Sequence, residues 1–286
     1  MVRLFKRGSR KQIARIEVKG AIAGATRNRV LENLKTVEER EFPALLLRID
    51  SPGGTVGDSQ EIYEALKRLG KKIKIVASYG NISASGGVYI GMGAQHIVAN
   101  PGTITGSIGV ILRGNNIERL LEKVGVSFKV IKSGPYKDIL SFDRELTEPE
   151  QKILQELIDI SYSQFVQTVA ESRNLPEETV RTFADGRIFT GQQAVGLGVV
   201  DRLGTEEDAR RWACELVNLD PEKTKTHTFE ERKSLVSRFT SNSASQRGGA
   251  VRLEGLIAAL PPLVVGMNWL EFELETCGLP LWLYRP

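Results

Sequence analysis

Short apolar runs alternate with longer amphipathic stretches between Ile13 and Leu203, which is the pattern of an α/β fold built in layers. The run at Ala44–Ile49 is almost continuously apolar, as expected for a strand covered on both faces. The full pattern predicts strands at Ile13–Val18, Ala44–Ile49, Ile73–Ser78, His96–Ala99 and Ser127–Lys132. It predicts helices at Arg27–Glu41, Ser59–Leu69, Ser85–Gly93, Asn116–Val124, Glu148–Arg173 and Thr205–Val217.

The stretch Glu148–Arg173 predicts the longest of these helices. Thr147 precedes it as an N-cap, and Pro149 lies in its first turn, where a missing N–H leaves no hydrogen bond unmade. Apolar residues recur on one side of the helix, together with one serine: Leu154, Leu157, Ile158, Ser161, Phe165 and Val169. This apolar face offers a surface for packing, either within the chain or between copies of it.

Composition shifts predict four parts of the chain. Residues 1–12 form a basic tail, and residues 13–219 form the folded domain. Residues 220–250 are rich in Lys, Thr, Ser and Arg, which predicts a polar linker. Residues 251–286 form an apolar C-terminal segment, whose longest apolar run is too short to span a bilayer. Its sequence fits an interfacial or partner-binding segment as well as a piece packed on the domain.

Charge and cysteine content narrow the function classes. The formal net charge of +4 is small for 286 residues, and acids are spread almost as densely as bases, so we expect no nucleic-acid partner. Two cysteines and two histidines are too few for a disulfide framework or a ready-made metal site, so we expect no metal and no cofactor. The sequence has no Walker-type loop, so we expect activity without ATP.

The first residues are basic without a compensating acid, which fits either a solvated tail or peripheral contact with anionic lipid headgroups. The apolar core of a signal peptide does not follow them, and no anchor segment is recognised near them. On this pattern we expect a cytoplasmic protein or one at the membrane periphery.

Two glycine-containing turns carry candidate chemistry. In the turn 50–55, Gly53 and Gly54 follow the buried strand, and their N–H groups could bind an extended peptide or a developing oxyanion. In the turn 81–87, Ser85 opens a predicted helix, and the N–H of Gly86 could point at the oxygen of a tetrahedral intermediate. The alternatives are a tight structural turn at 50–55 and a simple helix cap by Ser83 or Ser85.

A nucleophilic serine needs a base, and a lysine is the best candidate in this sequence. His96 begins a predicted strand beyond the serine, and His227 lies in the predicted linker. Shifting the pKa of a lysine from about 10.4 to near 7 costs roughly 4–5 kcal/mol of desolvation, so the base should lie among small or apolar residues. Lys137 meets this condition in a third turn at 133–140, although Asp138 must point elsewhere; the alternative is an exposed loop lysine.

Several motifs in order resemble the signal peptide peptidase A (protease IV) family. They are Ser-Pro-Gly-Gly at 51–54, Ser-Ala-Ser-Gly-Gly-Val-Tyr at 83–89, Pro-Gly-Thr-Ile-Thr-Gly-Ser-Ile-Gly-Val at 101–110, Lys-Ser-Gly-Pro-Tyr-Lys-Asp-Ile at 132–139 and Ala-Asp-Gly-Arg-Ile-Phe-Thr-Gly at 184–191. The resemblance runs from about Ile13 to Gly204. It implies a ClpP/crotonase-like fold with a Ser–Lys dyad that cleaves peptides, including signal-peptide remnants.

Carried to this sequence, the resemblance implies that Ser85 is the nucleophile and Lys137 the general base. It implies an oxyanion hole at Gly86 and Gly54, with Ser107 and Thr105 supporting the lysine ammonium. Family members form ring-like homo-oligomers in which the serine and the lysine can come from different subunits. Two alternatives remain: a crotonase-like acyl-CoA hydratase or isomerase, for which no glutamate is found in the turns at 81–87 or 101–110, and an inactive oligomeric scaffold.

Overall fold

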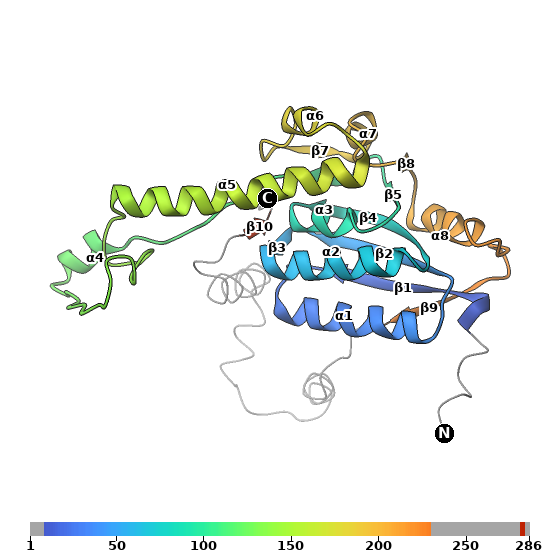
Figure 1. The fold of residues 1–286 in the computed structure, drawn as a ribbon, viewed down its shortest axis with the longest axis horizontal. Helices are drawn as coiled ribbons and strands as arrows, with labels where there is room; N and C mark the ends of the chain where they lie inside the picture. The colour runs from blue at the N-terminus through green and yellow to red at the C-terminus, as the bar shows by residue number, and fades with distance from the viewer. Residues whose placement is uncertain (1–8, 230–280, 284–286) are drawn as a thin grey trace, which may run out of the picture. The chain divides into compact units, whose positions relative to one another are not determined.

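The computed structural model describes residues 9–229 and 281–283, which form a mixed α/β fold (Figure 1). A 3₁₀ turn at Ser9–Lys11 leads into the first strand. The strands are β1 (Gln12–Lys19), β2 (Ala44–Ser51), β3 (Gly53–Thr55), β4 (Lys74–Ala84), β5 (His96–Ala99), β6 (Ile104–Gly106), β7 (Ile188–Thr190), β8 (Arg202–Leu203), β9 (Lys225–Phe229) and β10 (Leu281–Leu283). The helices are α1 (Gly24–Glu39), α2 (Val56–Gly70), α3 (Gly86–Gly91), α4 (Glu118–Lys123), α5 (Glu148–Arg173), α6 (Glu177–Arg181), α7 (Gly191–Gly196) and α8 (Glu206–Glu215).

The main sheet of the described residues runs in the order β7-β6-β4-β2-β1-β9, with β5 and β8 joined beside β4. All of its pairs are parallel except β6 with β7. Strand β4 is long enough to pair with β5 along its first half and with β6 along its end. The carboxyl ends of β2 and β4 therefore meet at one edge, where Ser51 lies opposite Ser83.

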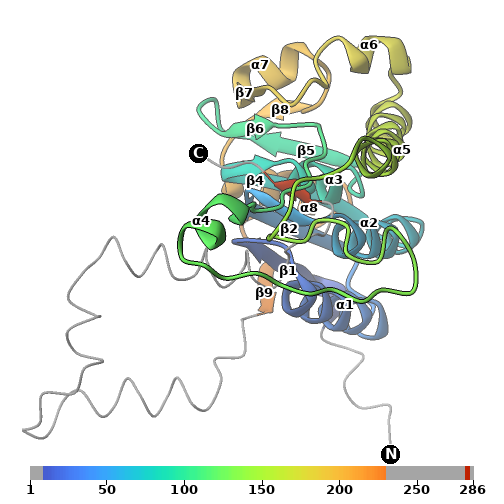
Figure 2. The same cartoon turned by 90° about the vertical axis from the view of Figure 1, so that its left-hand side faces the viewer.

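Successive residues of the central strands point to opposite faces of the sheet. On β2, Leu45 and Leu47 join the larger core cluster, whereas Ala44 and Leu46 join a smaller cluster that includes Ala209 of α8. Both faces are thus covered, which is why this strand is apolar at nearly every position. Figure 2 shows α1 and α2 along one side of these strands.

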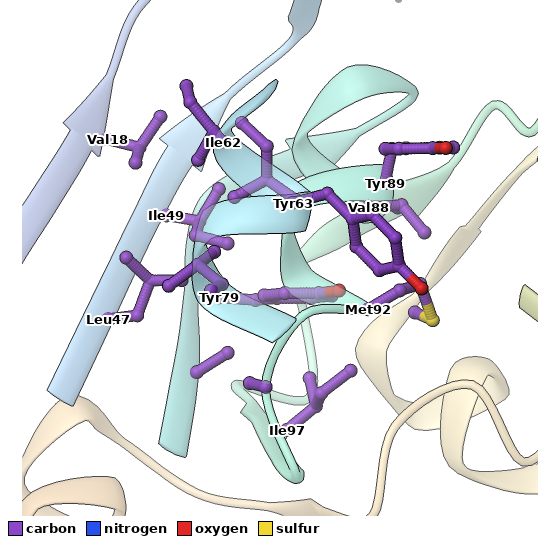
Figure 3. Packing of buried hydrophobic residues seen from close by; sticks show 14 of the residues in the cluster. Val18, Leu47, Ile49, Ile62, Tyr63, Tyr79, Val88, Tyr89, Met92 and Ile97 are labelled. Carbon is purple, nitrogen blue, oxygen red and sulfur yellow. The ribbon is translucent and has the colours of Figure 1, made fainter. Parts of the chain in front are cut away.

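The larger cluster packs directly beneath α3. Tyr79 of β4 is fully buried, and its hydroxyl would lie 2.2 Å from a Cβ placed on Gly91. Figure 3 shows Tyr79 among Leu47 and Ile49 of β2 and Val88 of α3. Dense packing of this kind leaves little freedom at the junction between β4 and α3.

Helix α5 has the bounds that the sequence predicts, and Thr147 and Glu150 form a capping box at its start. Its second half packs on the core through Phe165, Val166 and Val169. In its first half, by contrast, the apolar side chains of Ile153, Leu157 and Ile160 are exposed. Figure 1 shows this half, together with the segment that holds α4, extending beyond the sheet.

Two expectations about secondary structure fail. The segment 127–132 is an exposed coil rather than a strand, because no described strand lies beside it to pair with its backbone. Within the predicted linker, Lys225–Phe229 forms β9, which extends the sheet parallel to β1. Residues 230–250 of the predicted linker, most of the basic tail and most of the apolar C-terminal segment lie outside the described residues. Within the described ranges, no helix combines the length and apolar character needed to cross a bilayer.

Candidate active site

Ser85 lies at the junction of β4 and α3, at the carboxyl end of a central strand. In open α/β sheets this is the edge where ligands bind. Its φ of 53° and ψ of −116° lie outside the regions that non-glycine residues favour. Backbone strain of this kind persists where the surrounding structure enforces it, and it is concentrated at functional sites.

The hydroxyl of Ser85 is buried without a hydrogen-bond partner among the described residues. The residue as a whole is 1% exposed. The hydroxyls of Tyr79 and Ser83 on β4 are also buried, so the strained backbone is what distinguishes Ser85 from them. The N–H of Ser85 donates to the carbonyl of Gly106 at 2.8 Å, which engages this amide, and the role of the next one, Gly86, as an oxyanion donor stays a prediction.

Gly86 and Gly87 begin α3 directly behind the serine. A Cβ on Gly87 would lie 2.9 Å from the carbonyl oxygen of Ser51, so glycine allows α3 to approach the end of β2 this closely. The N–H of Gly86 belongs to the first turn of the helix and has no carbonyl partner inside it. The local sequence thereby places an N–H of the first helical turn next to the serine.

Gly54 is the centre of β3, which follows β2 after the turn at Pro52. Ile22 clamps it from one side: the Ile22 N–H donates to Gly53 at 2.8 Å, and Thr55 donates to the Ile22 carbonyl at 2.9 Å. Since peptide groups alternate along a strand, the N–H of Gly54 faces the opposite edge. A Cβ on Gly54 would lie 1.9 Å from the Ile22 oxygen, so the position is closed to any side chain.

Thr105 and Ser107 lie beside the serine, because β6 pairs with the end of β4 and sets Thr105 opposite Ser83. The Thr105 hydroxyl donates to the Ser83 carbonyl at 2.7 Å and so fixes the end of β4. Ser107 has a φ of 52°, and its N–H donates to the Arg187 carbonyl at 2.8 Å. Their support of a lysine ammonium stays a prediction.

Neither histidine of the chain can reach Ser85 within one copy. His96 lies opposite Val76, nine residues before Ser85 on a strand that rises about 3.3 Å per residue. It packs on Trp212, with ring centroids 4.4 Å apart, and burial lowers its pKa. His227 is on β9, separated from β4 by β1 and β2, and stacks on Phe42.

Lys137 lies on the segment between α4 and α5, and its side chain is exposed. Its ammonium has no hydrogen bond or ion pair with any residue that the structure describes. Asp138 does point elsewhere, as the sequence argument requires: Arg144 and Lys132 hold its carboxylate at 2.8 and 2.6 Å and lower its pKa. A single copy therefore assembles Ser85, Gly86, Gly54, Thr105 and Ser107, but it leaves Lys137 without the shielding that a base requires.

Sequence reasoning missed Asp50 as part of the site. Its carboxylate accepts from the N–H of Ile82 at 3.1 Å and from the side-chain amide of Asn81 at 3.2 Å. These bonds fix the irregular stretch of β4 that leads to Ser85, where the register with β2 shifts. An acidic residue at the end of an apolar strand was the available signal.

The chain is similar in sequence to known protease families and to proteins that are named as proteases. Residues 67–220 match the model of peptidase family S49, and residues 7–101 match that of Clp protease. The protein slr0021 of Synechocystis sp., which carries the name of a protease, is 67% identical over 285 residues, with 100% of both chains covered. An Enterococcus faecium protein named for signal peptide peptidase SppA is 38% identical and covers 82% of this chain and 70% of its own.

Protease 4 of Salmonella typhi is 32% identical over 90% of this chain, which spans 41% of that protein. Among solved structures, a mutant of the 1510-N membrane-bound stomatin-specific protease superposes with a TM-score of 0.54 at 16% identity, covering 77% of this chain and 98% of that one. This likeness concerns the fold and, with the Clp protease match, confirms the predicted ClpP-like arrangement. The chain belongs to peptidase family S49, the family of signal peptide peptidase A and protease 4, and is a serine-type peptidase.

Proposed function

We propose that the protein cleaves peptides through a dyad made of Ser85 from one copy of the chain and Lys137 from a neighbouring copy. The observation that carries this proposal is the Ser85 hydroxyl in a chain of the S49 family: it is buried at a strained junction and has no hydrogen-bond partner among the residues that the structure describes. Burying a hydroxyl without a hydrogen-bond partner costs free energy. A base that accepts a hydrogen bond from Ser85 in the assembled particle would remove this cost.

The proposed reaction has two halves. The neutral amine of Lys137 takes the proton of Ser85 as Oγ attacks the peptide carbonyl, and the resulting oxyanion accepts hydrogen bonds from Gly86 and Gly54. The ammonium then protonates the leaving amine as the C–N bond breaks, which leaves an acyl ester on Ser85. Water, deprotonated by the same lysine, hydrolyses this ester and restores the serine.

Two copies are proposed because the lysine lacks shielding in one. An exposed ammonium is well solvated, and a base needs surroundings that favour the neutral amine. The segment around Lys137 exposes large apolar side chains that a second copy can cover. Single apolar residues are common on protein surfaces, but so many on one segment are typical of an interaction site. These side chains are Leu120, Val124, Val126, Phe128, Val130, Ile131, Tyr136 and Phe142. We therefore propose a homo-oligomer in which this segment reaches the Ser85 site of its neighbour.

The proposed substrates are unfolded or apolar-rich peptides, cleaved without ATP. The relative named for signal peptide peptidase supports peptides of the signal-sequence type. The proposed glycine donors bind the backbone of the substrate. Since every peptide has the same backbone, such a site accepts peptides of many sequences.

A cleavage assay with an internally quenched leucine-rich peptide tests the proposal. The wild-type protein should cleave it without metal or nucleotide, and Ser85→Ala and Lys137→Ala should each abolish cleavage while keeping the native mass. Lys129→Ala is the matched control, because Lys129 is an exposed lysine of the same segment. Full activity in Lys137→Ala would refute the assignment of the base, and full activity in Ser85→Ala would refute that of the nucleophile.

A further inference from the structure

The outer edge of β3 is paired with a strand from the far end of the chain. Leu281–Leu283 (β10) lies antiparallel to Gly53–Thr55 (β3), with Trp282 opposite Gly54 (Figure 1). More than two hundred residues separate the two strands in sequence. They form a sheet of their own, separate from the main one.

This pairing uses the edge that carries the proposed oxyanion donor. The bonds of Gly53 and Thr55 to Ile22 take up the inner edge of β3, so the N–H and C=O of Gly54 face β10. In an antiparallel ladder a residue whose peptide groups face its partner belongs to a hydrogen-bonded pair. The N–H and C=O of Trp282 consequently face Gly54, whereas those of Leu281 and Leu283 face away.

The C-terminal strand also lies against α3, the helix that begins at Gly86. It therefore contacts both elements that carry the proposed oxyanion donors. Ser85, between these elements, is 1% exposed in this arrangement. A substrate must reach its Oγ, so an arrangement that buries the nucleophile is a resting one.

We propose that Leu281–Leu283 is a tethered ligand of the peptide-binding edge, which blocks that edge until a substrate displaces it. This inference rests on the proposed function, and it adds that β3 binds peptides by strand addition. The residues around β10 read Gly-Leu-Pro-Leu-Trp-Leu-Tyr-Arg-Pro at 278–286, with a single charged side chain. Substrates that compete with this segment are extended apolar peptides. One residue of such a peptide directs both its N–H and its C=O towards Gly54, as Trp282 does.

Two proline variants of the full chain test the blocking role. Trp282→Pro removes an N–H that faces Gly54, whereas Leu283→Pro removes one that faces away and leaves the Gly54 pair intact. If the segment occupies the edge nine-tenths of the time, releasing it raises kcat/KM for the quenched leucine-rich peptide by about tenfold. We expect Trp282→Pro to exceed Leu283→Pro by at least about threefold.

A binding measurement separates this inference from the proposed function. A fluorescein-labelled peptide of sequence 278–286 should bind the Trp282→Pro protein more tightly than the wild type, as measured by anisotropy, because the edge is vacant in the variant. N-methylation of the peptide at its Trp282 position should abolish binding, and N-methylation at its Leu283 position should not.

The outcomes differ for the two claims. Tighter binding to Trp282→Pro with no cleavage by any protein would refute the proposed function and uphold the tethered ligand. Cleavage at equal rates by both proline variants, with equal peptide binding to variant and wild type, would overturn the tethered ligand and leave the proposed function standing.

Discussion

Replacing Gly54 with alanine tests the packing that builds the site. The new Cβ would lie 1.9 Å from the carbonyl oxygen of Ile22 and 2.6 Å from its carbonyl carbon and its nitrogen. All three atoms are backbone, so no side-chain rotation relieves the contact. Either β3 or the segment at Ile22 must move by about 1 Å. We expect a loss of at least about 2 kcal/mol in the free energy of unfolding, in the range of overpacked cores.

The measurement is thermal unfolding followed by circular dichroism. For a domain of this size, about 2 kcal/mol corresponds to a midpoint roughly 4–8 °C lower. A displacement of that size also moves the proposed oxyanion donor, so kcat/KM should fall by about 100-fold.

Gly57→Ala is the control, because its Cβ meets nothing within 4 Å and its position is an exposed one on α2. This variant should be as stable as the wild type or up to about 1 kcal/mol more stable. A Gly54→Ala protein with unchanged midpoint and activity would show that Ile22 does not clamp β3.

Three further predictions concern the strand end, the α5 cap and the exposed segment. Thr105→Val removes the buried hydrogen bond to the Ser83 carbonyl and should lower the free energy of unfolding in urea by about 1–3 kcal/mol. The control Thr182→Val, at an exposed position, should change it by no more than about 0.5 kcal/mol, and equal losses would refute the role of the buried bond. Glu150, 2% exposed, has its pKa lowered to about 2 by Arg144 and Thr147, so its stabilisation is present above its ordinary pKa of 4.5 and is lost as pH falls towards 2. The difference in midpoint between wild type and Glu150→Gln should therefore shrink between pH 7 and pH 2, and a constant difference would contradict the assignment. Ile131→Ser, at a fully exposed apolar position, should lower the native mass in light scattering while Lys129→Ser does not; an unchanged mass would argue against this segment as the interface.

The central strands and the long helix could be predicted from the sequence because their patterns are long and regular. The apolar run at Ala44–Ile49 and the capped stretch at Glu148–Arg173 are found where the pattern predicts them. The shorter strands β6, β7 and β8 contain two or three residues each, too few for a period to appear. Strand β9 is mostly polar, and only its pairing with β1 reveals it.

The error at 127–132 has a different origin. Its alternation of Val126, Phe128 and Val130 fits a strand, but a strand also needs a neighbour for its backbone, and periodicity does not report one. For the site, the structure brings Ser85, Gly86 and Gly54 together at one edge of the sheet, and their catalytic roles stay predictions. They could not indicate that Lys137 is exposed in a single copy, because shielding depends on what packs over the segment.

Mixing two inactive variants tests most directly whether the dyad joins two copies. Ser85→Ala and Lys137→Ala chains carrying different affinity tags are co-expressed, and particles with both tags are purified. In a head-to-tail ring, half of the serines and, independently, half of the neighbouring lysines are intact, so about a quarter of wild-type activity should return. Mixed particles without activity, alongside active wild-type particles prepared the same way, would contradict a dyad shared between copies.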